Sequence, residues 1–130
     1  LGGSFRGQRV CVLGAAFKPN SDDVRDSPAL DIAARIHNEG GRVVVHDPKA
    51  LANAEARYPA LTYDPDLAHA LAGADIVLVL TEWQEYRDLD PHAIALAVAA
   101  PRVLDGRNTL DAAAWRAAGW TFRGMGREHG

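Results

Sequence analysis

Short apolar runs alternate with amphipathic segments along this chain. The runs at residues 9–13, 43–46, 76–80 and 102–105 are rich in valine, isoleucine and leucine, a composition typical of strands buried on both faces of a parallel sheet. Two shorter runs, at residues 61–63 and 120–122, predict small additional strands. The pattern therefore predicts five or six strands.

Helices are predicted between these runs. Ser27-Pro28 and Asp90-Pro91 each combine a capping residue with a proline that fits the first helical position. We expect the first helix to stop at Gly40 and the second to reach Ala99, where Pro101 blocks continuation. Further helices are predicted at residues 50–57, 66–71 and 112–118.

The alternation of strands and helices indicates right-handed βαβ units. We expect an α/β fold, a Rossmann-like three-layer sandwich with a mostly parallel sheet of five or six strands in the order 3-2-1-4-5-6. The 130 residues fit a single domain, structured over about residues 5–127, with residues 1–4 and 127–130 as loose ends.

Composition and charge narrow the function classes. Fourteen basic and seventeen acidic residues give a net charge of −3, which argues against nucleic acid as a partner. No apolar stretch approaches the ~18 residues needed to cross a bilayer, and no signal-peptide pattern opens the chain, so no membrane association is expected. The protein is expected to be cytoplasmic. Its single cysteine, Cys11, lies inside a predicted strand, where a buried apolar role is favoured over a nucleophilic one. The five histidines lack ligand spacing, and no metal site is expected.

The connection after the first predicted strand is unusually long. It spans residues 14–27, whereas strand-to-helix loops in such folds are commonly two to six residues. Ala16 and Pro19 occupy positions where the dinucleotide-binding pattern G-x-G-x-x-G would need glycine. We therefore expect that this domain does not hold NAD in the ordinary way.

Two cations in or near this edge suggest an anion site. Ligands of such sheets bind at the carboxyl ends of the strands, and Lys18 follows the first strand while Arg107 follows the fifth. Glu82 and Trp83 follow the fourth strand and are expected on the same side, as polar and aromatic walls. Arg25 is a third candidate cation.

Two alternatives stay open at this point. Lys18 and Arg25 are equally well explained as solvated or as paired with Asp22 and Asp23. Asp47 follows the second strand, where it suits either a ribose-binding acid or an ordinary strand-to-turn ending.

Five motifs carry a resemblance to a known family. They are VLGAAFKPNSDDVRDSPAL at residues 12–30, HDP at 46–48, GADIVLVLTEW at 73–83, DGRN at 105–108 and GMGR at 124–127. Their order from about Phe5 to Arg127 resembles the C-terminal, UDP-binding domain of the UDP-glucose/GDP-mannose dehydrogenase family. Enzymes of that family oxidise the sugar C6 alcohol of a nucleotide sugar to a carboxylate, with two NAD and a cysteine thiohemiacetal.

The resemblance implies roles for four residues. Phe17 and Lys18 match the substrate-binding Phe-Lys pair, Arg107 matches the substrate-binding arginine, and Arg25 matches an arginine that reaches NAD across the cleft. It also implies upstream NAD-binding and dimerisation domains that hold the cofactor and the catalytic cysteine, and a homo-oligomer for the full-length enzyme. This domain alone is then expected to be inactive.

Departures from the family pattern are mild and leave the sugar open. His46 stands where tyrosine usually precedes Asp-Pro, and Ser21 replaces threonine. UDP-glucose is the first expectation, on frequency alone, over UDP-N-acetylhexosamines and GDP-mannose. Two other interpretations remain: a free-standing nucleotide-sugar regulator, and an NAD-binding Rossmann module of another oxidoreductase.

Overall fold

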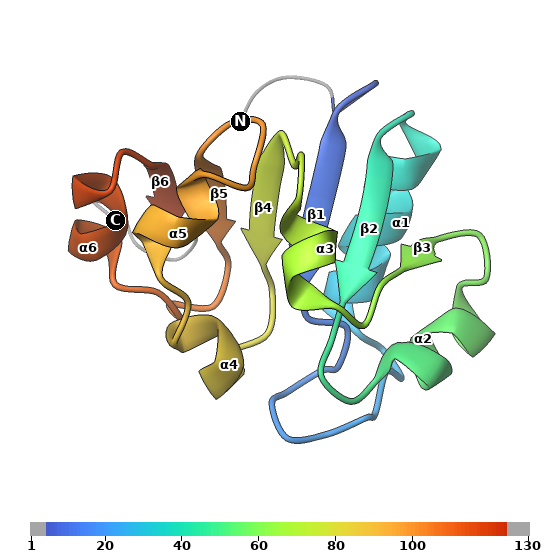
Figure 1. Ribbon diagram of the computed structural model, residues 1–130. Coiled ribbons are helices and arrows are strands. Elements are labelled where there is room, and N and C mark those ends of the chain that lie inside the picture. The colour runs from blue at the N-terminus through green and yellow to red at the C-terminus, as the bar shows by residue number, and fades with distance from the viewer. Residues whose placement is uncertain (1–4, 125–130) are drawn as a thin grey trace.

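Six parallel strands form one sheet in the order β3-β2-β1-β4-β5-β6 (Figure 1). The computed structural model describes residues 5–124. Its strands are β1 (Arg9–Leu13), β2 (Arg42–His46), β3 (Thr62–Tyr63), β4 (Ile76–Val79), β5 (Arg102–Asp105) and β6 (Thr121–Gly124). The predicted fold class and strand order are confirmed.

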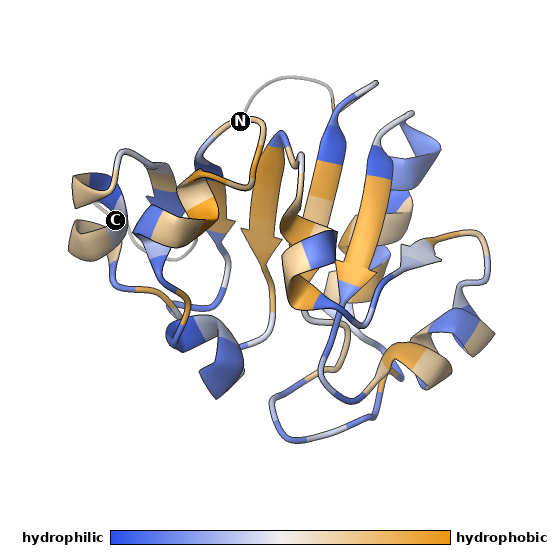
Figure 2. Ribbon diagram, viewed as in Figure 1, coloured by the Kyte–Doolittle hydropathy of each residue, from blue (hydrophilic) through white to orange (hydrophobic). Residues whose placement is uncertain are grey.

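Each central strand buries side chains on both faces of the sheet. Val10 and Val12 of β1 belong to one apolar cluster, which includes Leu30 of the first helix. Cys11 and Leu13, which point the other way, belong to a second cluster. Figure 2 shows the result as hydrophobic central strands that end in more polar connections. This two-sided burial explains why the strand sequences are continuously apolar rather than alternating.

Helices cover both faces and one edge. They are α1 (Pro28–Asn38), α2 (Leu51–Arg57), α3 (Leu67–Leu71), α4 (Gln84–Arg87), α5 (Pro91–Ala95) and α6 (Ala112–Ala117). In Figure 1, α1 lies behind the sheet while α3 and α5 lie in front of it. The predicted cap of α1 is present, since the Ser27 hydroxyl accepts the Leu30 N–H at 3.2 Å.

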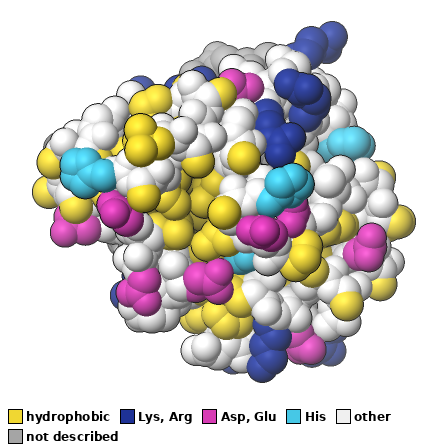
Figure 3. Space-filling model, in the orientation of Figure 1, with side chains coloured by type: hydrophobic (Ala, Val, Ile, Leu, Met, Phe, Trp, Pro, Cys, Tyr) yellow, Lys and Arg dark blue, Asp and Glu magenta, His cyan; other side chains and the backbone are white. Residues whose placement is uncertain are grey.

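The helix after Asp90 is shorter than predicted. It ends at Ala95 rather than Ala99, because the following residues make backbone hydrogen bonds to another part of the chain. The N–H of Ala99 donates to the Ala74 carbonyl at 2.9 Å. Leu96, directly after the helix, is 90% exposed, and Figure 3 shows hydrophobic side chains at the surface around α5. The one-turn helix α4 was not predicted.

Some sequence predictions fall on residues 1–4 and 125–130, which lie outside the described residues. These are the two loose ends and most of the GMGR motif. In the part of the chain that is described, no helix combines the length and the apolar character needed to span a membrane.

Candidate functional site

The exits of β1, β4 and β5 meet at one edge of the sheet. Leu13 pairs with Val79, and Val79 pairs with Asp105, so the last residues of the three strands are in register. The long loop of residues 14–27 extends from this edge, with α2 and α4 close by (Figure 1). The side chains that follow these strands therefore share the edge at which open α/β sheets bind ligands.

The start of the long loop is held by its own backbone N–H groups. Gly14 donates to the His46 carbonyl at 2.7 Å. Ala15 and Ala16 both donate to Oδ2 of Asp47, at 2.8 and 3.1 Å. The residues at the end of β2 thus fix the first turn after β1.

The carbonyl groups of the same turn are also occupied. Ser27 Oγ donates to the Ala15 carbonyl at 2.7 Å, and Thr81 Oγ1 donates to the Ala16 carbonyl at 2.9 Å. Gly14 has a φ of +111°, and a Cβ there would lie 2.8 Å from the Thr81 backbone nitrogen. Glycine is therefore required where the chain after β1 passes Thr81, just beyond the end of β4.

Asp47 is used entirely within the protein. Its other oxygen, Oδ1, accepts the N–H groups of Lys49 and Ala50, each at 2.8 Å. The side chain is buried, and both of its oxygens already accept two hydrogen bonds. Of the two interpretations of Asp47, the structure supports the strand-to-turn ending.

This turn does not fit a dinucleotide phosphate. In Rossmann folds that bind NAD, the pyrophosphate is held by free backbone N–H groups after the first strand. Here the N–H groups of Gly14, Ala15 and Ala16 already have protein acceptors. The missing glycines and this hydrogen-bond pattern both argue against a pyrophosphate held by the backbone of this turn.

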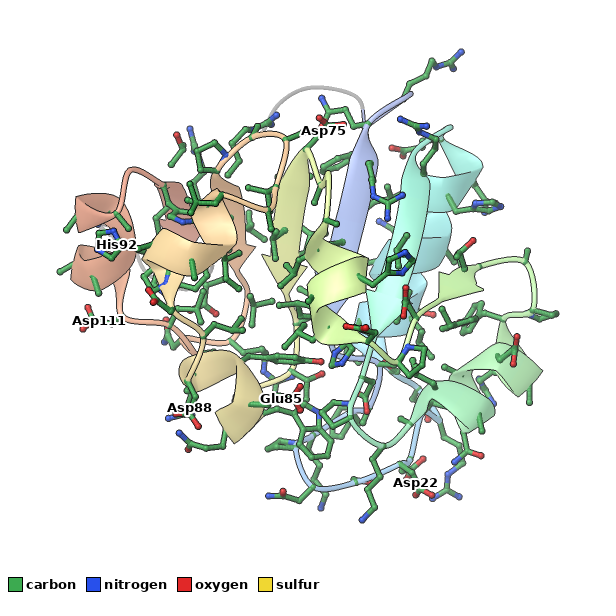
Figure 4. All side chains as sticks on the ribbon, viewed as in Figure 1. Asp22, Asp75, Glu85, Asp88, His92 and Asp111 are labelled. Atoms are coloured by element: carbon green, nitrogen blue, oxygen red, sulfur yellow. The ribbon has the colours of Figure 1, made fainter. Side chains whose placement is uncertain are left out.

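Phe17 and Lys18 follow directly from this fixed turn. The Phe17 N–H donates to the Asp23 carbonyl at 3.0 Å, which closes the loop, and the ring is 50% exposed. Lys18 is exposed and makes no salt bridge to any described residue. Farther along, the Asn53 amide donates to the Asp22 carbonyl at 2.9 Å, and Figure 4 shows Asp22 near α2.

Arg25 is held by Asp23. Its Nε and Nη2 donate to the two carboxylate oxygens at 3.1 and 3.0 Å, and this contact lowers the pKa of Asp23 to about 2. The Arg25 side chain is 80% exposed. The pairing alternative is thus correct for Arg25, while a role toward a cofactor is not tested by the structure.

Arg107 and Glu82 are brought together as the sequence predicted. Arg107 Nη2 donates to Glu82 Oε1 at 2.9 Å. The backbone around Arg107 is fixed by buried Asp105, whose two oxygens accept the N–H groups of Arg107 at 3.1 Å and Leu110 at 2.7 Å. No hydrogen bond or salt bridge joins Arg107 to Lys18, so their convergence on one ligand stays a prediction.

Trp83 is not an aromatic wall of the site. It is 8% exposed and packs in the second apolar cluster with Tyr86. It directly precedes α4, so its burial anchors the start of that helix. The expectation that Trp83 forms an aromatic wall of the site was wrong, because its ring is buried among the apolar side chains of this cluster.

A buried histidine–tyrosine pair at the same edge was not predicted from the sequence. Tyr86 Oη donates to the His46 carbonyl at 3.1 Å and lies 2.9 Å from His46 Nδ1. Since the hydroxyl has one proton, Nδ1–H is the donor to Oη. His46 Nε2 lies 3.9 Å from Oε2 of Glu85 on α4, a residue labelled in Figure 4. Burial lowers the pKa of His46 despite the nearby carboxylate.

Cys11 is sealed inside the sheet. It is fully buried in β1, and burial raises the pKa of its thiol to about 12. A thiolate nucleophile is therefore not available at this position, as its place in the strand predicted.

Sequence comparison decides the family. The model of the UDP-glucose/GDP-mannose dehydrogenase family, UDP binding domain, matches residues 11–112. The chain belongs to this family. The resemblance carried by the five motifs is thereby confirmed, and the matched segment includes both the long loop and the Asp-Gly-Arg turn.

Individual relatives agree with this assignment. The chain is 36% identical over 126 residues to a UDP-glucose 6-dehydrogenase of Rhizobium meliloti, covering 97% of this chain and 29% of that protein. A UDP-glucose dehydrogenase structure from Pyrobaculum islandicum has a TM-score of 0.75 at 37% identity, over 92% of this chain and 25% of that one. A structure of NDP-N-acetyl-D-galactosaminuronic acid dehydrogenase from Methanosarcina mazei has a TM-score of 0.85 at 29% identity, over 98% and 26%. The chain thus spans less than a third of these relatives.

Proposed function

We propose that this chain binds the UDP part of a nucleotide sugar, as the UDP-binding domain of an NAD-dependent UDP-glucose 6-dehydrogenase that makes UDP-glucuronate. The observation that carries the proposal is that β1 and β5, the strands that precede Lys18 and Arg107, end in register at the same edge of the sheet. Lys18 follows β1 and Arg107 follows β5, with β4 between the two strands, and buried Asp47 and Asp105 fix the backbone that leads to each. The family match independently supports UDP as the ligand.

Each proposed ligand residue has a suitable chemical character. Lys18 is an exposed point charge without a salt bridge in the described chain, which suits a phosphate. Arg107 offers a planar set of N–H donors, only one of which is used by Glu82. The half-exposed ring of Phe17 supplies an apolar surface beside Lys18. We assign these three residues to substrate binding and Arg25 to a contact with NAD.

In this proposal NAD is held mainly by other domains of the protein. NAD would serve there as the hydride acceptor for oxidation at C6. The turn after β1 lacks free N–H groups for its pyrophosphate, and Cys11 is too buried to act on the sugar. Arg25, exposed at the rim of the long loop, is the residue of this chain that we expect to reach the cofactor.

UDP-glucose is the proposed sugar nucleotide. The Rhizobium meliloti relative is named for it, whereas the Methanosarcina mazei structure is named for an N-acetylated sugar acid. Because these two relatives are named for different sugars, the identity of the sugar needs a direct comparison of substrates. UDP-glucose and UDP-N-acetylhexosamines are compared as substrates of the full-length enzyme, and a higher kcat/KM for an acetylated sugar would replace glucose in the proposal.

A titration of the chain with UDP and with NAD tests the ligand. We expect UDP to bind and to shift backbone NMR signals within residues 14–25, 81–83 and 105–108. NAD is expected to bind more weakly than UDP or not at all. Shifts confined to other surfaces would contradict the site, and tighter binding of NAD would contradict the assignment to UDP.

A further inference from the structure

Two consecutive residues after β4 connect the two parts of the candidate site. Thr81 Oγ1 donates to the Ala16 carbonyl, next to Phe17 and Lys18. Glu82 accepts from Arg107, on the turn after β5. The residues after β4 therefore form hydrogen bonds with the loop after β1 on one side and with the turn after β5 on the other.

Glu82 is itself well fixed. Thr81 before it is fully buried, and Trp83 after it is packed in the core. The side chains of Glu82 and Arg107 are 26% and 34% exposed, so their ion pair is partly shielded from water. A carboxylate with an anchored backbone can hold a flexible arginine in one orientation.

The geometry of the pair leaves Arg107 able to bind a ligand. Only Nη2 of its guanidinium donates to Glu82, at 2.9 Å. None of its other side-chain N–H groups has an acceptor in the described part of the chain. A ligand could therefore be bound without breaking the ion pair.

We propose that Glu82 is the positioning residue for Arg107, and that it orders the guanidinium before the nucleotide arrives. The proposal rests on the proposed function, in which Arg107 contacts the ligand. A long arginine side chain that is free in solution must be ordered on binding, and this ordering opposes association. Because Glu82 already orders the guanidinium in the free protein, less side-chain freedom is lost when the ligand binds.

The negative charge of Glu82 acts in the opposite direction. It repels an anionic ligand, so its removal would strengthen UDP binding if charge dominated. Glutamine separates the two effects, because its amide oxygen can still accept from Arg107 while its charge is gone. Positioning predicts that Glu82→Ala weakens binding and that Glu82→Gln preserves it, whereas charge repulsion predicts tighter binding in both.

The experiment measures the Kd of UDP for the chain and five variants by calorimetry. We expect Glu82→Ala to raise the Kd about threefold to tenfold and Glu82→Gln to stay within about twofold of the unmodified chain. Arg107→Ala should raise it further, and adding Glu82→Ala to that variant should change nothing more. Glu85→Gln changes a carboxylate on α4 that faces His46 and makes no salt bridge to Arg107 in the described part of the chain; it is the matched control and should leave the Kd unchanged.

The outcomes separate this inference from the function on which it rests. If the unmodified chain does not bind UDP, or Arg107→Ala binds it normally, the proposed function of Arg107 fails. If Arg107→Ala weakens binding but Glu82→Ala does not, only the positioning role fails. Equal weakening by Glu82→Ala and Glu82→Gln also overturns it. Urea unfolding of each variant shows whether a lost affinity reflects a lost fold.

Discussion

The hydroxyl of Thr81 donates a hydrogen bond to the carbonyl oxygen of Ala16 at 2.9 Å. The bond crosses from the exit of β4 to the loop after β1, and both residues are buried. It satisfies a carbonyl group that has no access to water. This single contact ties the segment that carries Phe17 and Lys18 to the centre of the sheet.

Thr81→Val should destabilise the protein by about 1–3 kcal/mol, because it leaves the buried Ala16 carbonyl without a donor at almost unchanged side-chain volume. The change is measured as a lower urea midpoint. Thr62→Val, at an exposed threonine of β3, is the matched control. A loss at Thr81 no larger than at Thr62 would show that the hydrogen bond contributes little.

Asp47→Asn should cost roughly 2 kcal/mol or more in the free energy of unfolding. An amide offers one acceptor oxygen, so two of the four N–H groups that Asp47 binds would face an NH₂ group. The control is Asp111→Asn, an exposed helix cap that accepts from Ala114, where asparagine caps as well as aspartate. Equal urea midpoints for both variants would contradict the role given to Asp47.

Arg107→Ala should weaken UDP binding by about 1.5–3 kcal/mol, or on the order of tenfold to a hundredfold in Kd. The lost interaction is a charge-assisted hydrogen bond to the ligand. Arg42→Ala removes an exposed arginine at the opposite end of the sheet and should leave the Kd unchanged. An unaltered Kd in the Arg107 variant refutes its assignment.

Stability should fall as the pH drops below about 6.5 because of His46. Burial lowers its pKa in the folded state from the ordinary value of 6.5, so the unfolded chain takes up a proton that the folded chain resists. The contribution is fully present above pH 6.5 and is lost as the pH falls toward the folded-state pKa. His46→Gln should flatten the dependence of unfolding free energy on pH between about 7.5 and 5.

The exposed His69 provides the matched control for this pH dependence. Its hydrogen bond with Asp64 raises its pKa, so its contribution has the opposite sign and is present at low pH. His69→Gln should therefore leave the acid-side loss in place or deepen it slightly. If the profile flattened with His69→Gln and not with His46→Gln, the loss of stability at low pH would not come from His46.

The chain alone should show no dehydrogenase activity with NAD and UDP-glucose, followed as absorbance of NADH. The turn after β1 lacks free N–H groups for a pyrophosphate, and the Cys11 thiol is sealed in β1. A thiol reagent should label Cys11 only after unfolding. NADH formation by this chain, compared with a full-length family enzyme assayed in parallel, would contradict the prediction.

Local pattern was sufficient for the strands and for most helix starts. The bounds predicted for β1, residues 9–13, are those observed. A short, continuous apolar run is typical of a strand that is buried on both faces of a parallel sheet. Ser27-Pro28 likewise marks the start of α1 correctly. In both cases the information lies within a few neighbouring residues.

What the sequence did not predict depends on contacts between distant segments. The chain after Ala95 leaves the helical path to bind the Ala74 carbonyl. Tyr86 and His46 are 40 positions apart. Asp105 was recognised only as part of a family motif, although a carboxylate directly after a strand and before a glycine turn is a usable sign of a side chain that binds its own turn.

The saturation of the Gly14–Ala16 N–H groups by His46 and Asp47 has a consequence for how affinity varies with ionic strength. Backbone dipoles buried at a helix end are poorly screened by salt, but an exposed ammonium such as Lys18 is screened over about 8 Å in physiological buffer. A phosphate held at this edge relies on such side chains. Its binding should therefore weaken as salt is added, more steeply than in a dinucleotide site built from backbone amides.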